Sequence, residues 1–393
     1  MPVRIMLALL VVAFAPLFAQ ASEWPAPPGI QAKAWAVIDA RTGTVLAQKD
    51  GDRQLPPASL TKMMTLYLAF EDLSQGRLKP DEVVSVSNKA WKIGGSTMFL
   101  EPRMKPTVEQ LLHGIATLSG NDACIALAEH VAGTEEAFVS RMNEKARALG
   151  MNHTHFVNAT GFPAKGHYSS PLDMAKLGAA LWRDFPQYYD IFSEREYSYA
   201  GHTQPNRNRL LWSYPGADGI KTGHTQEAGY CLVGSAEKEG NRFVAAVFGT
   251  DSDRARAAQT KALLQYAFRN FVTVRPAERK IRRQVEVFSG SENHVWLKPK
   301  RVVEVTVPRG AERKLAFRLR YDAPIMAPIK AGQTLGTIDA VLKNDGKDGK
   351  VLASIPMVAA RDVPRASWFG RTIDALRLWW RGTEEQDEAS ATQ

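Results

Sequence analysis

Residues 57–70 read Pro-Ala-Ser-Leu-Thr-Lys-Met-Met-Thr-Leu-Tyr-Leu-Ala-Phe, and they open a predicted helix that extends to Leu73. Prolines stop the preceding extended segment, and apolar residues then recur at helical spacing. Ser59 and Lys62 are three positions apart on this helix, so the lysine amine can reach the serine hydroxyl. A serine hydroxyl is a poor nucleophile until a base takes its proton, and lysine can be that base only where burial or a neighbouring cation lowers its pKa. The stretch therefore predicts a nucleophile, Ser59, with its general base, Lys62.

Two further short motifs follow in chain order, Ser119-Gly-Asn121 and Lys221-Thr-Gly223. The first falls at a break between two predicted helices, and the second precedes two apolar strand segments. Single matches also occur at Ser235-Ala-Glu-Lys238 and Ser291-Glu-Asn293, but these lie in a turn and in a polar loop. The three motifs in this order and context are the signature of penicillin-binding proteins and class A β-lactamases.

The second motif supplies two polar side chains to the predicted site. Ser119 is suited to relay a proton to a leaving amine, and Asn121 to hydrogen-bond a substrate amide. Lys221, from the third motif, could lower the pKa of Lys62 and attract an anionic substrate.

The third motif is interpreted as a strand beside the nucleophile. Thr222 offers a hydroxyl to a terminal carboxylate, and Gly223 permits the close approach of a peptide. The backbone N–H groups of Ser59 and His224 would then form the oxyanion hole.

The sequence resembles the serine-type D-alanyl-D-alanine carboxypeptidases, the low-molecular-mass penicillin-binding proteins, over nearly the whole mature chain. Besides the three motifs, the segments that carry the resemblance are Gly94-Gly-Ser-Thr-Met-Phe-Leu100, Ser119-Gly-Asn-Asp-Ala-Cys124, Asn206-Arg-Asn208 and Asp218-Gly-Ile-Lys-Thr-Gly-His-Thr225. The resemblance implies an α+β catalytic domain like that of serine β-lactamases, an antiparallel sheet with a helical cluster. A small all-β domain and a C-terminal amphipathic helix would follow.

The same resemblance implies an activity and one more site residue. The activity is removal of the terminal D-alanine from peptidoglycan pentapeptides through an acyl-enzyme, without a cofactor and with penicillin as a covalent inhibitor. The family also has an arginine, downstream of the Lys-Thr-Gly lysine, that pairs with the substrate carboxylate. Its spacing before a helix predicted over 261–271 fits Arg256 best, with Arg254 as the alternative.

Two other functions remain as alternatives. A class A β-lactamase needs a glutamate four residues before an asparagine between the second and third motifs. Here Asn143, Asn152 and Asn158 are preceded at that distance by valine, alanine and threonine, so slow penicillin turnover is expected. The other alternative is a non-catalytic cell-wall-binding scaffold, against which the intact motifs argue.

The ends of the chain predict export and a membrane surface. Residues 1–21 have the pattern of a cleaved secretory signal, with Arg4, an apolar run and a final Ala-Gln-Ala. Residues 22–275 are the predicted catalytic domain and 276–361 a small β-sandwich domain. Residues 364–382 form an amphipathic helix, rich in tryptophan, that would lie on the outer face of the cytoplasmic membrane, followed by a polar acidic tail at 383–393.

Composition excludes other classes. The hydrophobic fraction of 45% and the charged fraction of 23% are those of a globular protein. Two cysteines, Cys124 and Cys231, are too few for a disulfide scaffold and are interpreted as buried thiols. One close histidine pair, His153-x-His155, and the absence of an H-E-x-x-H motif give metal catalysis little support. No nucleic-acid motif occurs, and oligomeric state stays open.

The net charge is +9, of which residues 276–361 carry +8. The region before them is nearly neutral. This distribution predicts that the β domain faces anionic lipid headgroups or cell-wall polymer.

Overall fold

The computed structural model describes residues 24–344, 347–368, 372 and 374. The predicted signal, most of the predicted terminal helix and the acidic tail lie outside these residues. The helices and helical turns are η1 (Ala58–Thr61), α1 (Lys62–Ser74), α2 (Asn88–Lys92), α3 (Val108–His113), η2 (Gly114–Leu118), α4 (Asn121–Ala132), α5 (Glu135–Ala148), α6 (Pro171–Asp184), η3 (Pro186–Ser193), α7 (Leu210–Ser213), α8 (Asp253–Asn270), α9 (Glu278–Ile281) and η4 (Glu312–Lys314). The strands are β1 (Ala34–Asp39), β2 (Val45–Lys49), β3 (Glu196–Tyr199), β4 (His202–Pro205), β5 (Ala217–Thr225), β6 (Gly229–Lys238), β7 (Asn241–Thr250), β8 (Phe271–Val274), β9 (Arg283–Phe288), β10 (His294–Pro299), β11 (Val305–Pro308), β12 (Leu315–Arg320), β13 (Ile325–Met326), β14 (Thr334–Asn344) and β15 (Lys347–Ala359).

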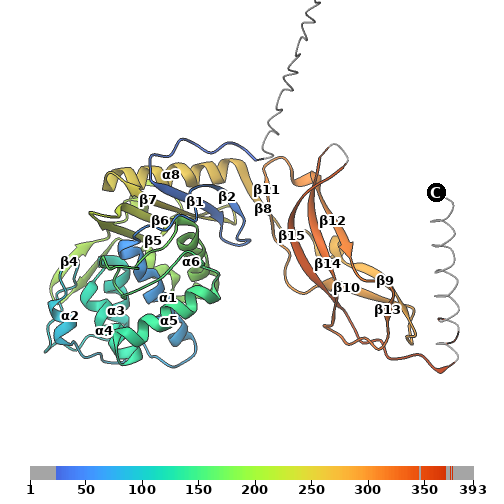
Figure 1. Ribbon diagram of the computed structural model, residues 1–393, viewed down its shortest axis with the longest axis horizontal. Helices are drawn as coiled ribbons and strands as arrows, with labels where there is room; N and C mark the ends of the chain where they lie inside the picture. The colour runs from blue at the N-terminus through green and yellow to red at the C-terminus, as the bar shows by residue number, and fades with distance from the viewer. Residues whose placement is uncertain (1–23, 345–346, 369–371, 373, 375–393) are drawn as a thin grey trace, which may run out of the picture.

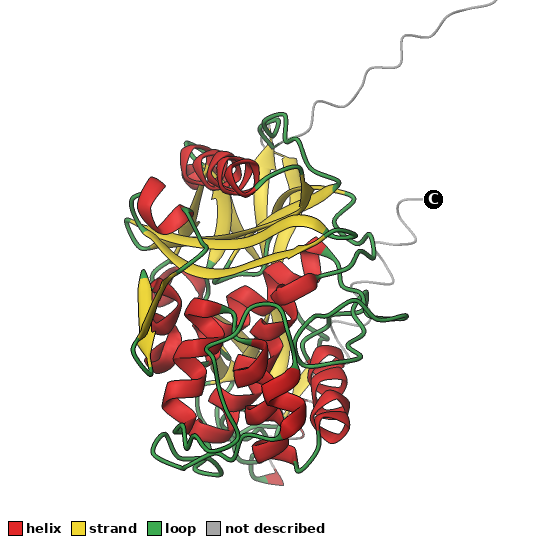
Figure 2. Ribbon diagram, turned by 90° about the vertical axis from the view of Figure 1, so that its left-hand side faces the viewer, coloured by secondary structure: helices red, strands yellow, loops and turns green. Residues whose placement is uncertain are grey.

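The first part of the chain, from β1 to α8, forms an α+β domain around a five-stranded antiparallel sheet of order β2-β1-β7-β6-β5. Figure 2 shows this sheet between α8, with a short helix beside it, on one side and the main cluster of helices on the opposite side. β7 is buried along nearly its whole length because both faces of the sheet are covered, which explains its continuous apolar sequence. The predicted antiparallel sheet with a helical cluster is confirmed.

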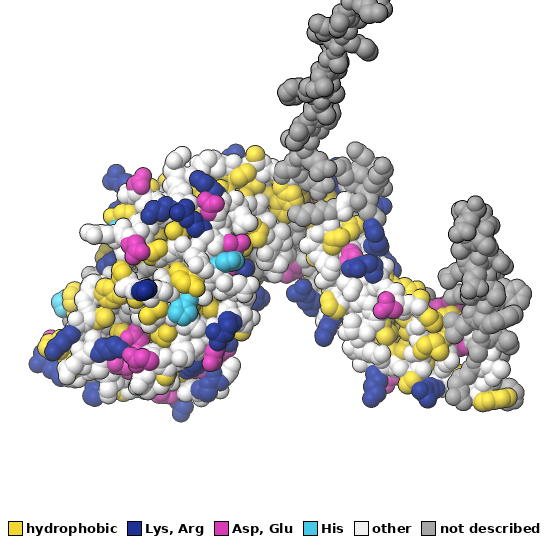
Figure 3. Space-filling model, in the orientation of Figure 1, with side chains coloured by type: hydrophobic (Ala, Val, Ile, Leu, Met, Phe, Trp, Pro, Cys, Tyr) yellow, Lys and Arg dark blue, Asp and Glu magenta, His cyan; other side chains and the backbone are white. Residues whose placement is uncertain are grey.

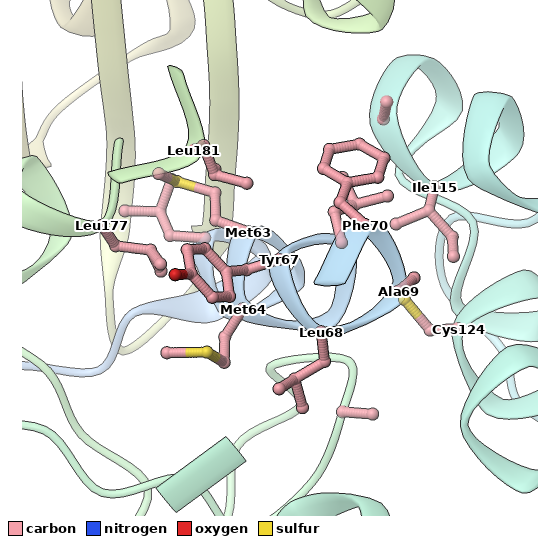
Figure 4. Packing of buried hydrophobic residues seen from close by; sticks show 14 of the residues in the cluster. Met63, Met64, Tyr67, Leu68, Ala69, Phe70, Ile115, Cys124, Leu177 and Leu181 are labelled. Atoms are coloured by element: carbon pink, nitrogen blue, oxygen red, sulfur yellow. The ribbon is translucent and has the colours of Figure 1, made fainter. Parts of the chain in front are cut away.

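Helix α1 is the centre of the helical cluster and determines where the first motif lies. Its side chains are buried on every face rather than along one stripe, as expected for a helix inside a core. Figure 4 shows Met63 and Tyr67 beside Leu177 of α6, and Phe70 farther along α1, near Ile115. Because neighbouring elements pack against α1 on all sides, the turn η1 that precedes it is held in one position.

The second part of the chain forms a β domain from β9 to β15, in orange in Figure 1. Its six-stranded sheet has the order β12-β14-β15-β10-β9-β13, and a separate pair joins β11 to β8. A core of its own packs between these layers. The predicted all-β character is confirmed. The strands β10 and β13 were not anticipated: β10 ends on Pro299, and β13 has only two residues, too few for a recognisable pattern.

Asp39, at the end of β1, connects the two domains. Its fully buried carboxylate accepts hydrogen bonds from Thr306 of β11 (2.9 Å) and from Thr273 of β8. It also accepts the backbone N–H of Arg41 at 2.8 Å. A carboxylate that water cannot reach needs hydrogen-bond donors from the protein. These hydrogen bonds therefore hold β8 and β11 against the sheet of the α+β domain.

Cys124 and Cys231 are both free and buried, so the interpretation as buried thiols is confirmed. Within the residues that the structure describes, no helix combines the length and the apolarity needed to cross a membrane.

Candidate active site

Ser59 and Lys62 are in contact, as the first motif predicts. Ser59 lies in the short 3₁₀ turn η1, where residues three apart lie directly above one another, and Lys62 begins α1. The Lys62 Nζ atom donates to Ser59 Oγ at 3.0 Å and to the carbonyl oxygen of Thr160 at 2.7 Å. The serine hydroxyl therefore has its only candidate base, among the described contacts, within hydrogen-bond distance.

The surroundings of Lys62 favour its neutral form. Its side chain is fully buried, and burial lowers its pKa to about 8, with the Arg207 cation acting in the same direction. A lysine with a pKa of about 8 is neutral in roughly one tenth of the molecules at pH 7, and this neutral form can accept a proton. Lys62 can act as a base only if its pKa is lowered, and burial is the main cause of that lowering.

Ser119 stands at an unusual point of the backbone. It follows the π-helical turn η2 and has a φ of 64°, a left-handed conformation that ends the helix. Its Oγ atom is buried and has no hydrogen-bond partner among the residues that the structure describes. Asn121 begins α4 two residues later, and its side-chain amide donates to the Gly94 carbonyl at 2.8 Å. The Ser119 hydroxyl is thus available for a ligand.

Strand β5 carries the third motif along the other side of Ser59. Lys221 is buried and donates to the Thr222 carbonyl at 3.3 Å. Burial, followed by the charge of Lys62, holds the pKa of Lys221 well below its usual range. A Cβ atom on Gly223 would lie 2.8 Å from the Pro57 carbonyl oxygen, so glycine is required for β5 to pack against the turn before Ser59. From the sequence, Gly223 was instead expected to permit the close approach of a substrate peptide.

A cleft of about 1180 Å³ joins most of the predicted site. Six predicted residues line it: Ser59, Ser119, Thr222, Gly223, His224 and Arg256. The other three, Lys62, Asn121 and Lys221, are buried beside this lining rather than on it. All nine are thus brought together around one cleft, with Lys62, Asn121 and Lys221 buried beside it.

The structure corrects one detail about Arg256. Helix α8 begins at Asp253 and not near residue 261, because Ser252 caps its N-terminus by accepting from the Ala255 N–H. Arg256 therefore lies inside the first turns of α8. It is buried, lines the cleft and donates to the Gly223 carbonyl at 3.1 Å, whereas Arg254 is exposed and does not line the cleft.

A loop over residues 156–167, to which the sequence interpretation gave no role, completes the surroundings of Lys62. The backbone N–H of Val157 donates to His167 Nδ1 at 3.1 Å, so the other ring nitrogen donates to Thr61 Oγ1 at 2.8 Å. Burial lowers the pKa of His167 to about 4, which keeps the ring neutral. A Cβ on Gly161 would meet the Ala58 carbonyl at 1.8 Å, so the loop backbone rests directly on η1.

Two further side chains were missed. Asp122 is buried and accepts from the Met98 and Leu100 backbone N–H groups, which holds residues 94–100 against α4. Arg207 lines the cleft and donates to Ser96 Oγ at 2.6 Å. Both residues lie in segments on which the family resemblance rests, so the resemblance could have pointed to them. Thr160 acts through its backbone carbonyl, and no sequence motif reports that.

No group of three or more histidine, cysteine, aspartate or glutamate side chains that could hold a metal ion occurs in residues 24–344, 347–368, 372 and 374.

Comparison with known proteins identifies the family. Residues 21–252 match the family model described as D-alanyl-D-alanine carboxypeptidase, and residues 271–365 match that of the penicillin-binding protein 5 C-terminal domain. The chain belongs to the D-alanyl-D-alanine carboxypeptidase family. It is 40% identical to D-alanyl-D-alanine carboxypeptidase DacA of Escherichia coli strain K12, over 90% of this chain and 89% of that protein.

Other members of the D-alanyl-D-alanine carboxypeptidase family match along nearly their full length. DacF of Bacillus subtilis is 38% identical over 86% of this chain and 87% of its own. The crystal structure of penicillin binding protein 5 from Haemophilus influenzae superposes with a TM-score of 0.81 and 36% identity, and covers 87% of this chain and 100% of that one. Membership makes this chain a serine-type D-Ala-D-Ala carboxypeptidase, a hydrolase.

Proposed function

We propose that Ser59 carries out this hydrolysis on peptidoglycan pentapeptides through an acyl-serine intermediate. The observation that carries the proposal is the 3.0 Å contact between Ser59 Oγ and the amine of the buried Lys62. Neutral Lys62 takes the hydroxyl proton, and Ser59 Oγ attacks the carbonyl carbon of the penultimate D-alanine. Ser119 relays a proton to the amine of the terminal D-alanine as the C–N bond breaks. Water then hydrolyses the ester and restores the serine.

The other predicted residues would hold the substrate during these steps. Arg256 and Thr222 lie on the same cleft as Ser59, where they can bind the terminal carboxylate. Asn121 would bind a peptide amide, and the amine of the buried Lys221 would donate a hydrogen bond to the substrate. Backbone N–H groups of Ser59 and His224 would stabilise the tetrahedral oxyanion.

Replacement of Ser59 by alanine tests the nucleophile. Release of D-alanine from a diacyl-Lys-D-Ala-D-Ala peptide and covalent labelling by penicillin should both be abolished, because each requires the same Oγ atom. Ser291→Ala, in the similar tripeptide of the β domain, is the matched control and should retain both. Activity or labelling that survives in Ser59→Ala would show that another residue is the nucleophile.

The β-lactamase alternative is tested with the same reagents. No glutamate occupies the position that such enzymes use for deacylation. The penicillin adduct should therefore decay far more slowly than peptide turns over. Penicillin hydrolysis at a rate comparable with D-alanine release would support the alternative instead.

We propose further that the protein is exported and bound peripherally to the outer face of the cytoplasmic membrane through residues 364–382. The first described part of this segment supports the idea, since the side chain of Trp368 is 65% exposed. Asp374 accepts from the Ser289 backbone N–H at 2.7 Å, so the segment begins in contact with the β domain. Lys and Arg side chains are spread over the visible face of that domain in Figure 3.

Deletion of residues from 364 onward tests the anchor. The shortened chain should leave the membrane fraction and still release D-alanine, because the cleft lies in the α+β domain. Membrane binding that persists after the deletion would contradict the proposal. High salt should weaken binding of the full chain where the basic β domain contributes.

A further inference from the structure

The cleft extends beyond the groups that a terminal D-alanine uses. In the proposed function the leaving residue spans the distance from Ser59 to Arg256, and its side chain is a single methyl group. Five more residues line the same cleft, and we call them its outer part: Arg209, Trp212, Ser213, Tyr230 and Asp253. This outer part of the cleft has no role in the chemistry described above.

Trp212 is the most prominent side chain of the outer part. It lies on the short helix α7, whose Leu210 and Leu211 are buried and hold the helix in place. The indole is nevertheless 49% exposed, with the Arg195 guanidinium 5.9 Å from the ring centre. A large aromatic surface on a fixed element beside a cleft is suited to contact an apolar or planar group of a ligand.

A chain of charges among these lining residues fixes Arg256. Asp253 accepts from Arg256 Nη2 at 2.5 Å and from the Arg209 guanidinium. The Tyr230 ring lies 5.5 Å from the Arg256 guanidinium carbon. A carboxylate bound to Arg256 would thus be held in one place, and the side chain of the same residue would be the part of the ligand free to vary.

We propose that the outer part of the cleft, which Trp212 and the Arg209–Asp253 pair line, is a subsite for the side chain of a C-terminal D-residue larger than alanine. The ligand class is a long apolar or aromatic D-amino acid, which can pack against the indole and the flat guanidinium of Arg209. This inference rests on the proposed function, because Arg256 must bind the carboxylate for the side chain to reach the subsite. The reaction remains an amide hydrolysis, in which water is consumed and the free D-amino acid leaves.

Two peptides compared on the wild-type chain give the first test. The peptides are diacetyl-Lys-D-Ala-D-Ala and diacetyl-Lys-D-Ala-D-Phe, with a C-terminal L-Phe peptide as the stereochemical control. We expect kcat/KM for release of D-Phe to lie within about tenfold of that for D-Ala, since the subsite offers packing rather than a clash. Release of D-Phe that is more than about tenfold slower overturns the inference.

Tryptophan variants give the second test. Trp212→Ala should lower the ratio of D-Phe to D-Ala kcat/KM at least about fivefold, because the stacking surface is lost. Trp91→Ala is the matched control: Trp91 is 48% exposed on α2 and does not line the cleft, so the ratio should not change. A ratio that stays the same in Trp212→Ala, including the case in which both rates fall together, contradicts the assignment. The wild-type comparison decides the matter even if Trp212→Ala does not fold.

The outcomes separate this inference from the proposed function. If neither peptide is cleaved, the proposed function fails. If D-Ala is released and D-Phe is not, the proposed function stands and only the subsite is refuted.

Discussion

One arginine–aspartate pair in each domain shows how differently the two domains use charge. In the α+β domain Arg256 is the buried partner, with 6% of its side chain exposed against 31% for Asp253. In the β domain the order is reversed: the Arg320 side chain is 62% exposed and that of Asp339 6%. The pKa shifts follow this reversal. Burial lowers the pKa of Arg256, whereas the hydrogen bond to Asp339 raises that of Arg320.

The difference indicates what each pair is for. A cation that has lost its hydration and lines a cleft gains most from an anionic ligand, because few water molecules compete for it. An exposed arginine beside a buried carboxylate satisfies that carboxylate and contributes little else. We therefore expect the buried Arg256 to serve the reaction and the exposed Arg320 to serve the surface of the β domain.

The largest expected effect is the loss of Arg256. Arg256→Ala should lower kcat/KM for the diacyl-Lys-D-Ala-D-Ala peptide roughly 10²- to 10³-fold, because the substrate carboxylate loses its charged partner. Arg254→Ala, two residues away on the exposed face of α8, is the control and should stay close to wild type. D-alanine release measured over a range of peptide concentrations decides between them. A larger loss in Arg254→Ala would assign the carboxylate to that residue.

A smaller effect is expected where the two domains meet. Asp39→Ala removes a fully buried carboxylate and leaves the Thr273 and Thr306 hydroxyls without their acceptor, which should cost roughly 2 to 4 kcal/mol of stability. Thermal unfolding should therefore begin at a lower temperature. D-alanine release at 25 °C should change little, since Asp39 does not line the cleft.

Asp52→Ala is the control for this prediction, because the Asp52 side chain is 53% exposed. Its unfolding curve should match that of the wild type. A stability of Asp39→Ala equal to that of this control would show that the contact between β1 and β8–β11 contributes nothing.

The sequence predicted the elements that carry a periodic apolar pattern or a recognisable motif. The apolar spacing around Met63 and Met64 gave α1, and the three motifs gave the residues around the cleft. The start of α8 was placed too late, because Ala255 and Gln259 weaken the apolar period in its first turns, although Ser252 is an N-cap residue. Local patterns report local structure, so they locate these elements well.

Contacts between distant segments could not be predicted in the same way. The Thr160 carbonyl that binds Lys62 is a backbone group, which any residue would supply. The neutral state of His167 depends on burial by a loop and a turn roughly a hundred positions apart in the chain, as its bond to Thr61 shows. Such features arise from tertiary packing. Contacts between distant segments leave no local pattern that a single sequence would show.

A third effect concerns pH and the exposed edge of the cleft. Lys62 accepts a proton only when neutral, so kcat/KM should rise with pH through its pKa of about 8. The Arg207 charge helps to lower that pKa, and Arg207→Gln should therefore move the rising limb to higher pH. The shift should be a fraction of a unit because solvent screens Arg207. Arg320→Gln is the control, and a limb that moves to lower pH in Arg207→Gln would contradict this account.

The smallest effect is expected for Arg320 itself. Its hydrogen bond holds the pKa of Asp339 below the usual range, and Ser354 Oγ also donates to that carboxylate at 2.6 Å. A carboxyl group whose pKa is lowered by folding adds stability above its unfolded value of about 4, and this stability is lost as pH falls through the folded value. Arg320→Ala should thus lower the unfolding midpoint at neutral pH by less than about 2 °C, and the difference should vanish in acid or in 1 M salt. A large loss of stability, or any loss of D-alanine release, would show that the β-domain pair acts like Arg256 and Asp253 after all.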